Sequence, residues 1–297
     1  MTPPETPDTD IEIDDSPLTD REDPKGRVLS IAGSDSSGGA GIQADIKAVT
    51  ALGGYAATAI TAITVQSTRG VSAVHPVPPG ILAGQIEAVL GDIGADAIKT
   101  GMLGSAETVE TVLKALDDHG DPAIPLIVDP VMIAASGDRL VDDTALAAIR
   151  DRLAPRAWLL TPNIPEARAL TGVEIEDMDG QREAAEILLG RGAKAVLVKG
   201  GHMEGGDVID LLATRNGVRL FARPRIRTRQ THGTGCTLAS AVAALLAQGL
   251  SLDRAVEQAG DYVHEAIKRA PGFGAGAGPI NHGWTYSSGF GRAPVRD

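Results

Sequence analysis

The sequence predicts an α/β fold with three layers, in which helices cover both faces of a mostly parallel central sheet. Three observations support this prediction: short apolar runs that end in Gly, Pro or polar residues, amphipathic segments between those runs, and no internal repeat or linker. Apolar strands that alternate with amphipathic helices are typical of parallel sheets buried on both faces.

The expected strands are short apolar runs, each breaking into a polar or glycine-containing loop. They span residues 27–33, 55–66, 96–101, 124–130, 157–163 and 194–201. Two further runs, 205–214 and 217–226, are close enough in sequence to form a hairpin at the far side of the sheet.

The expected helices have apolar residues at helical spacing. They span residues 42–54, 78–93, 105–120, 142–153, 179–192, 233–249 and 252–270. In open parallel sheets, ligands sit in the loops that follow the carboxyl ends of the strands. The unusual polar and glycine-rich stretches fall in such loops, which predicts a small-molecule site.

We expect one compact domain over residues 27–285, preceded by an acidic leader over 1–26 and followed by a loose tail over 286–297. Nine acidic residues against Arg21 and Lys25 give the leader a net charge of −7, and its low hydrophobicity predicts disorder. Such a leader either recruits a partner or only improves solubility.

Composition narrows the class of protein. One cysteine excludes an intrachain disulfide, which suits a reducing cytoplasm. The N-terminus lacks the basic and apolar regions of a secretory signal, and no apolar run approaches the roughly 20 residues of a membrane span. The absence of a basic stripe with aromatics argues against nucleic acid as a partner. We therefore expect a cytoplasmic protein that binds no membrane.

The stretch "THGTGCT" holds that cysteine, Cys236, at the start of an expected helix. Gly233 and Gly235 allow a tight turn, and the unpaired N–H groups that follow favour an anion such as phosphate. The helix dipole is expected to lower the pKa of Cys236, which would make it a proton acceptor beside that anion. The alternative is a small cysteine packed in an Ala-rich helix.

Other loops carry candidate residues with ordinary explanations beside the functional ones. Asp45 meets a ligand or is simply a carboxylate in a first helical turn. Asn163 with Glu166 either organises hydrated Mg²⁺ or marks a helix start, with Pro165 in the first turn and Glu166 favoured by the helix dipole. Lys199 contacts phosphate or only ends a strand. His75, His202 and His264 lack metal-ligand spacing. The late "GFGAGAGP" follows no strand, so it is not a dinucleotide fingerprint.

Together these stretches resemble the kinases of hydroxymethylpyrimidine and phosphomethylpyrimidine, in the ribokinase-like group. The resemblance runs from about Arg27 to about Trp284. "IAGSDSSGGAGIQADIKAVTALGGYAATAITAITVQSTRGV" is similar to the family's opening almost residue by residue. "KTGML", "DPVM", "SGDRL", "TPNIPEA", "VKGGH" and "THGTGCT" follow in the family's order and spacing.

The resemblance implies a three-layer α/β/α fold, ATP with Mg²⁺ as the phosphoryl donor, and a pyrimidine alcohol that is phosphorylated twice on the route to thiamine. It also assigns residues. The pyrimidine would be bound by Gly33, Asp45, Gln66, Met102 and Val131; the nucleotide by Asn163, Glu166, Lys199 and Thr228; and Mg²⁺ by Asp129 and Glu166. Gly233, Thr234, Gly235 and Cys236 would form the anion hole, with Cys236 as the base.

The carboxamide of Gln66 can both donate to and accept from an aminopyrimidine edge. Related sugar kinases have an aspartate at the position of Cys236, so cysteine favours the pyrimidine branch. A pyridoxal or pyridoxine kinase of the same fold is the nearest alternative, and a non-catalytic ligand-binding relative is a weaker one. Family resemblance also suggests a homodimer.

Overall fold

The computed structural model describes residues 25–134, 137–203 and 205–286, and its centre is one eight-stranded sheet. The strand order is β10-β9-β8-β7-β6-β5-β1-β2. The strands are β1 (Arg27–Ala32), β2 (Tyr55–Ile60), β5 (Ala97–Thr100), β6 (Leu126–Val128), β7 (Leu159–Leu160), β8 (Ala195–Val198), β9 (Asp207–Thr214) and β10 (Gly217–Pro224).

The six strands from β2 to β8 run parallel, and β9 and β10 are antiparallel. At the centre, Val28 of β1 pairs with Ala56 on one side and Ala97 on the other. The expected hairpin over 205–226 is therefore present as β9 and β10.

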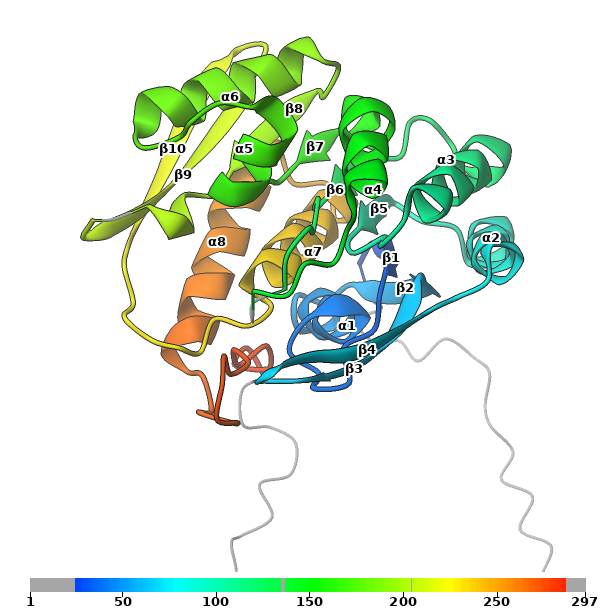
Figure 1. Cartoon of the computed structure of the whole chain (residues 1–297), viewed down its shortest axis with the longest axis horizontal. Coiled ribbons are helices and arrows are strands. Elements are labelled where there is room, and N and C mark those ends of the chain that lie inside the picture. The colour runs from blue at the N-terminus through cyan, green and yellow to red at the C-terminus, as the bar shows by residue number, and fades with distance from the viewer. Residues whose placement is uncertain (1–24, 135–136, 204, 287–297) are drawn as a thin grey trace, which may run out of the picture.

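Helices cover both faces of the sheet (Figure 1), which confirms the predicted three layers. One face is covered by α1 (Gly41–Ala51), α7 (Thr234–Ala247) and α8 (Leu252–Lys268). The other face is covered by α2 (Pro79–Ala88), α3 (Ala106–His119), α4 (Asp143–Ala148), α5 (Ile164–Thr171) and α6 (Met178–Gly190), with the short turns η1 (Val89–Ile93), η2 (Ile149–Leu153), η3 (Ala154–Arg156) and η4 (Gly200–His202).

Two apolar layers fill the space between sheet and helices. Leu29 and Ile31 of β1 point into the layer beneath α2 and α3, whereas Val28 points into the layer beneath α7. This alternation follows the two-residue period of a strand, which sends successive side chains to opposite faces. Helix α7 is buried along most of its length because strands β1, β5 and β6 and helices α1 and α8 pack around it.

The single strand expected over 55–66 is in fact two. It breaks at Thr61, where β2 leaves the sheet and β3 (Ala62–Ser67) begins. An unexpected strand, β4 (Gly70–Pro76), pairs antiparallel with β3 to form a ribbon separate from the main sheet (Figure 1), and Gln66 of β3 hydrogen-bonds with Ser36 in the loop after β1. The ribbon contains a register shift between Val65 and Gln66, opposite Ser72. Bulges of this kind bend a strand and redirect side chains.

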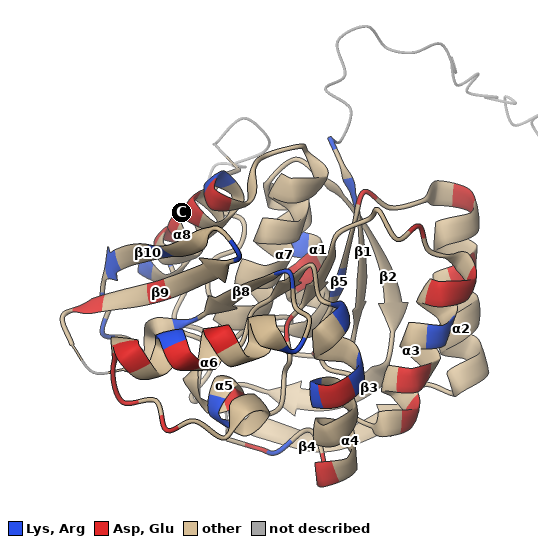
Figure 2. Ribbon diagram, turned by 90° about the horizontal axis from the view of Figure 1, so that it is seen from above, with Lys and Arg blue, Asp and Glu red and all other residues tan. Residues whose placement is uncertain are grey.

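The acidic leader and the loose tail fall almost entirely outside the described residues. Within the described ranges, no helix is long and apolar enough to cross a membrane. The exposed positions of α6 include three acidic residues, Asp179, Glu183 and Glu186, and one basic residue, Arg182 (Figure 2).

Candidate active site

A cavity of about 920 Å³ opens at the carboxyl ends of the parallel strands, where the loops after β1, β5, β6, β7 and β8 converge on the start of α7. Ligand sites in open parallel sheets are expected at this edge. The predicted site residues that line it are Gly33, Gln66, Met102, Asp129, Val131, Asn163, Glu166, Lys199, Gly233, Thr234, Gly235 and Cys236.

Helix α7 begins at Thr234 and points its first turn into the cavity. Its N-cap, Gly233, has φ +82°, and a Cβ there would lie 1.8 Å from the carbonyl oxygen of Gly39, so this turn requires glycine. No side chain in the described residues caps the helix. Its first N–H groups therefore face the cavity together with the positive end of the helix dipole, an arrangement suited to an anion.

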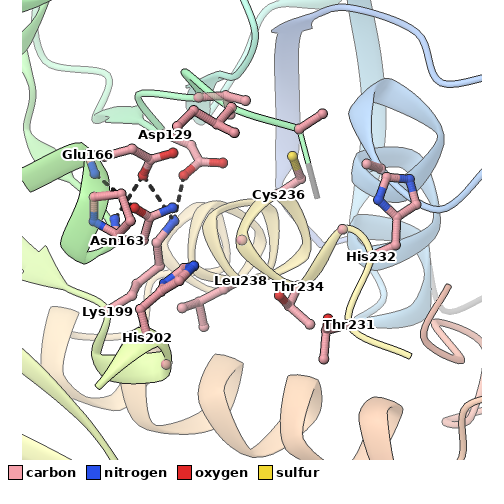
Figure 3. A pocket seen from close by; sticks show the side chains of 18 of the residues that line it. Asp129, Asn163, Glu166, Lys199, His202, Thr231, His232, Thr234, Cys236 and Leu238 are labelled. Carbon is pink, nitrogen blue, oxygen red and sulfur yellow. Dashed lines mark hydrogen bonds and ion pairs between the residues drawn. The ribbon is translucent and has the colours of Figure 1, made fainter. Parts of the chain in front are cut away.

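Cys236 lies in this first turn, between the group formed by Asp129, Glu166 and Lys199 and the imidazole of His232 (Figure 3). The expected lowering of its pKa is wrong for this ligand-free structure. Burial raises the pKa of Cys236 to about 12, and although Lys99 opposes the rise, the carboxylates of Asp129 and Asp45 add to it. The desolvation of a thiolate therefore outweighs the helix dipole.

A buried charge cluster forms one end of the cavity. The Nζ atom of Lys199 donates to Asp129 Oδ1 at 2.9 Å and lies 3.9 Å from Glu166 Oε2 (Figure 3). Burial raises the pKa of Glu166 to about 7, partly offset by Lys199 and reinforced by Asp129. A Cβ on Gly235 would lie 3.1 Å from Lys199 Nζ, so this lysine reaches the first turn of α7.

Asn163 and Glu166 form a reciprocal helix cap at the start of α5. The Asn163 side chain accepts from the Glu166 N–H at 2.9 Å, and Glu166 Oε2 accepts from the Asn163 N–H at 2.8 Å. The structural explanation offered by the sequence therefore holds, and both side chains line the cavity as well.

The other end of the cavity lies beneath the β3–β4 ribbon. Met102 packs against Gly33, since a Cβ on Gly33 would lie 2.4 Å from Met102 Cε. Gln66 follows the ribbon's register shift, and its Nε2 lies 3.5 Å from His232 Nε2. Val131 lines the same cavity from the loop after β6. This end combines apolar walls with one carboxamide.

Asp35 and His232 join the two glycine-rich loops. His232 Nε2 lies 2.7 Å from Asp35 Oδ2, and the same carboxylate accepts from the N–H groups of Ser37 and Ala40. Burial acts to raise the pKa of Asp35, but the hydrogen bonds from His232, Ser37 and Ala40 outweigh it and lower the pKa to about 2. The ionised carboxylate therefore fixes the loop after β1 against the turn before α7.

Two predicted site residues lie elsewhere. Asp45 is fully buried and does not line the cavity; its carboxylate accepts from Lys99 Nζ at 2.9 and 3.0 Å, and from Ser30 and Ser240 at 2.6 Å each. All of its acceptor positions face protein donors, so it is corrected to a structural role. Thr228 is also absent from the cavity lining, and its hydroxyl accepts from the Gln230 N–H.

Sequence reasoning missed several residues that line the cavity: Asp35, Arg139, His202, His232 and His264. The histidines at 202 and 264 were set aside because they lack metal-ligand spacing, yet a base or phosphate contact needs no such spacing. His232 and Asp35 both lie within the glycine-rich stretches that were singled out. The sequence signal that could have identified both residues is an ionisable side chain within a glycine-rich loop of the kind that binds phosphate.

The comparisons with known proteins agree with this geometry. The family model described as phosphomethylpyrimidine kinase matches residues 35–281. The chain is 50% identical over 259 residues to the thiamine biosynthesis bifunctional protein ThiED of Geobacter sulfurreducens, covering 87% of this chain but only 52% of that protein. It is 46% identical to the hydroxymethylpyrimidine/phosphomethylpyrimidine kinase of Bacillus subtilis, covering 86% of this chain and 94% of the relative.

Solved structures show the same likeness. The phosphomethylpyrimidine kinase of Clostridium difficile has a TM-score of 0.73 and 42% identity, covering 82% of this chain and 100% of that one. The pyridoxal kinase of Staphylococcus aureus in complex with AMP-PCP and pyridoxal has a TM-score of 0.80 and 34% identity, covering 89% of this chain and 96% of that one. The chain therefore belongs to the phosphomethylpyrimidine kinase family, with a ribokinase-like fold.

Proposed function

We propose that the cavity binds a pyrimidine alcohol beneath the β3–β4 ribbon and ATP at the Lys199 end, with the first turn of α7 between them. The chain is a hydroxymethylpyrimidine and phosphomethylpyrimidine kinase, an ATP-dependent phosphotransferase of thiamine biosynthesis. One observation supports placing the pyrimidine at the ribbon end of the cavity and ATP at the Lys199 end. Cys236 lies between the charge cluster and the ribbon side of the same cavity.

The apolar walls and the carboxamide suit a flat heteroaromatic ring. Met102 and Val131 supply apolar contact, and the Gln66 carboxamide supplies one donor and one acceptor to the ring edge. Gly33 leaves room for Met102 to lie against the loop after β1. The hydroxymethyl group of a ring held there would project toward Cys236.

The opposite end suits phosphate groups. The N–H groups of Gly235 and Cys236 would form the anion hole for the transferred phosphoryl group, and the Thr234 N–H, which donates to the Thr231 carbonyl at 3.3 Å, would close the turn beside it. Lys199 supplies a positive charge within reach of that turn, because its Nζ lies near Gly235. Phosphoryl transfer depends mainly on such positioning and charge stabilisation rather than on covalent chemistry.

The residues at this end also fit Mg²⁺. Asp129 and Glu166 are two buried carboxylates that share one lysine, and Mg²⁺ typically uses one or two carboxylates with waters and substrate phosphates. Among the described residues, no group of three or more acidic, His or Cys side chains could enclose a metal by itself. A bound Mg²⁺ would neutralise phosphate charge at this end, held by Asp129 and Glu166.

Cys236 is proposed as the proton acceptor for the hydroxymethyl group. Because its pKa is about 12, the resting side chain is a neutral thiol at neutral pH. The thiol must first lose its own proton to water, and the small thiolate fraction then takes the alcohol's proton as the new O–P bond forms and the bond from the phosphoryl group to ADP breaks. The second phosphorylation needs little base, since a phosphate acceptor is already ionised.

The test is Cys236→Ala, with the two phosphorylations measured separately as mono- and diphosphate product. General-base help is typically worth about 10²–10⁴-fold, so we expect a loss of that order in the first step and a small change in the second. The second step is the internal control for folding and ATP binding. An unaltered first step would remove Cys236 from the role of base.

The high pKa has its own check, because Cys236 is the only thiol in the chain. Since the thiolate is the reactive form, alkylation by iodoacetamide should be slow at pH 7 and accelerate as the pH rises through 9 toward 12. The first phosphorylation should rise with pH over the same range. Fast alkylation at pH 7 would show that the thiol ionises more easily than its burial implies.

Pyridoxal is the competing alcohol, since pyridoxal kinases share the fold at lower identity. The Gln66 carboxamide matches an aminopyrimidine edge, which favours the pyrimidine. We expect a higher kcat/KM for the pyrimidine alcohol than for pyridoxal when both are assayed with the same preparation. The reverse ratio would favour the pyridoxal alternative.

Two further expectations belong to this proposal: a cytoplasmic location, supported by the single cysteine, and a homodimer, which follows from family resemblance alone. Light scattering on the purified chain would distinguish a dimer from a monomer.

A further inference from the structure

A glycine-rich segment after α8, residues 273–282, crosses between the β3–β4 ribbon and the start of α7. We call this segment the brace. It includes "FGAGAG", part of the stretch that was rejected from the sequence as a dinucleotide fingerprint. None of its residues lines the cavity, yet it contacts both walls of the pyrimidine end.

On the ribbon side, the brace packs against the two-residue turn between β3 and β4. The Gly276 N–H donates to Thr68 Oγ1 at 3.3 Å. A Cβ on Gly276 would lie 1.9 Å from the Thr68 carbonyl oxygen, so the two backbones touch and position 276 requires glycine. Thr68 is two residues beyond Gln66 on the same strand and turn.

On the α7 side, the brace holds the anion-hole turn from behind. The His232 N–H donates to the Gly278 carbonyl at 3.0 Å, and His232 pairs with Pro279 as a short parallel bridge. His282 Nε2 lies 2.9 Å from Thr237 Oγ1, next in sequence to Cys236, and that hydroxyl also donates to the Gly233 carbonyl at 2.7 Å.

His282 is itself anchored to the body of the protein. It is 4% exposed, and the Tyr262 hydroxyl of α8 donates to its carbonyl at 2.6 Å. Burial, followed by the nearby Lys47 and His232, lowers the pKa of His282 to about 4, so the imidazole is neutral at physiological pH. The contact with Thr237 is therefore a neutral hydrogen bond between fixed partners.

We infer that the brace sets the spacing between Gln66 and Cys236, and that His282 is a positioning residue for phosphoryl transfer, acting through Thr237. This inference rests on the proposed function, because it assigns Gln66 to the ring and Cys236 to the transferred group. One continuous segment hydrogen-bonds both to the ribbon, which carries Gln66, and to the first turn of α7, which carries Cys236. The distance between ring and phosphoryl acceptor site is thus fixed from outside the cavity.

The ribbon contact is tested with Gly276→Ala, which pushes the ribbon away from the brace. A misplacement of about 1 Å can cost roughly 10²-fold in rate, and we expect about a tenfold rise in KM for the pyrimidine alcohol. KM for ATP should rise less than KM for the pyrimidine alcohol, because the brace contacts the anion-hole turn but not the Lys199 end of the cavity. Gly84→Ala is the matched control, since its Cβ meets open space on α2, far from the ribbon.

The α7 contact is tested with His282→Ala, for which we expect about a tenfold loss of kcat. His282→Gln retains a donor to Thr237 and should recover most of the loss. A purely structural role would lower the melting temperature in both variants without this recovery in kcat.

Amide hydrogen exchange tests the brace without any substrate. Its result therefore distinguishes an error in this inference from an error in the proposed function. In Gly276→Ala, exchange should accelerate at the ribbon, residues 62–71, and also at residues 232–237, while β1 and β5 keep their protection. Acceleration at only one of the two sites would overturn the coupling, whatever the substrate proves to be. Equal rises in KM for the pyrimidine and for ATP would overturn it as well.

Discussion

Two buried lysines near α7 have the same chemistry but opposite environments. Lys99, at the end of β5, is 0% exposed, and its Nζ donates to both oxygens of Asp45. Lys199, just after β8, is 9% exposed, donates to Asp129 and faces the cavity. For both, burial acts to lower the pKa, but the neighbouring carboxylates outweigh it, so both pKa values are raised.

The difference lies in what remains free to bind a ligand. The Asp45 carboxylate is shared among Lys99, Ser30 and Ser240, so that pair is closed on itself. Lys199 lies between two carboxylates at the rim of a cavity, where an incoming phosphate can take the place of one of them. A buried lysine can therefore contact a ligand only when an incoming anion can replace one of the carboxylates that pair with it.

The largest expected effect is on stability, from Lys99→Met. Removing one partner of a buried ion pair typically costs about 3–5 kcal/mol, because the other charge is left unpaired. Urea unfolding should show a loss of that order, with KM for ATP unchanged in the folded protein. The double variant Lys99→Met with Asp45→Asn should recover much of it, and a single-variant loss below about 1 kcal/mol would contradict the closed-pair description.

The next effect is on catalysis, from Lys199→Met. Removing one preorganised group that stabilises transition-state charge typically costs about 10²–10³-fold in kcat, and we expect a loss in that range. Stability should fall as well, because the buried Asp129 loses its ion-pair partner. Lys114→Met, on the exposed face of α3, is the control that should retain full activity. A Lys199 variant with normal kcat would place the phosphates elsewhere.

The smallest effect concerns Glu166, which pairs with Lys199. Its pKa of about 7 in the folded chain lies above the ordinary 4.5, so the folded state favours the protonated form. Its contribution to stability is present below pH 4.5 and is lost as the pH rises through 7. Glu166→Gln should therefore melt at a higher temperature than the parent at pH 8, and no higher at pH 4.5.

Gln keeps an oxygen for the Asn163 N–H, so the helix cap is preserved in this variant. The two melting curves should converge progressively between pH 7 and pH 4.5. A constant offset across that range would show that Glu166 titrates normally.

The fold was predictable because apolar runs mark strands buried on both faces, and amphipathic segments mark helices buried on one face. The sheet strands and most helices follow that pattern, including the 205–226 hairpin. The β3–β4 ribbon was not predictable in the same way, because Ile63, Val65 and Val74 are exposed and its apolar residues therefore do not mark a buried face. Strand 55–66 consequently read as one element rather than two.

The sequence was enough to predict which loops form the site, because glycine-rich and polar stretches at strand ends are seldom needed for packing alone. Most of the site residues that the resemblance implied do line the cavity. Asp45 was misplaced because a carboxylate in a first helical turn looks the same whether it faces a ligand or a buried lysine. The pKa of Cys236 was misjudged because the helix dipole is visible in sequence, whereas the desolvation of the thiol is not.

The register shift opposite Ser72 has a consequence for changing what the protein accepts. Ser72 is the extra residue of the ribbon, and its hydroxyl donates to the Val65 carbonyl at 3.1 Å. Shortening β4 by this one residue would straighten the ribbon and redirect the Gln66 carboxamide, with every cavity-lining side chain retained. Deleting one residue from β4 can thus alter substrate selectivity by moving Gln66 on the neighbouring strand β3. Substitution scans do not test such changes in chain length.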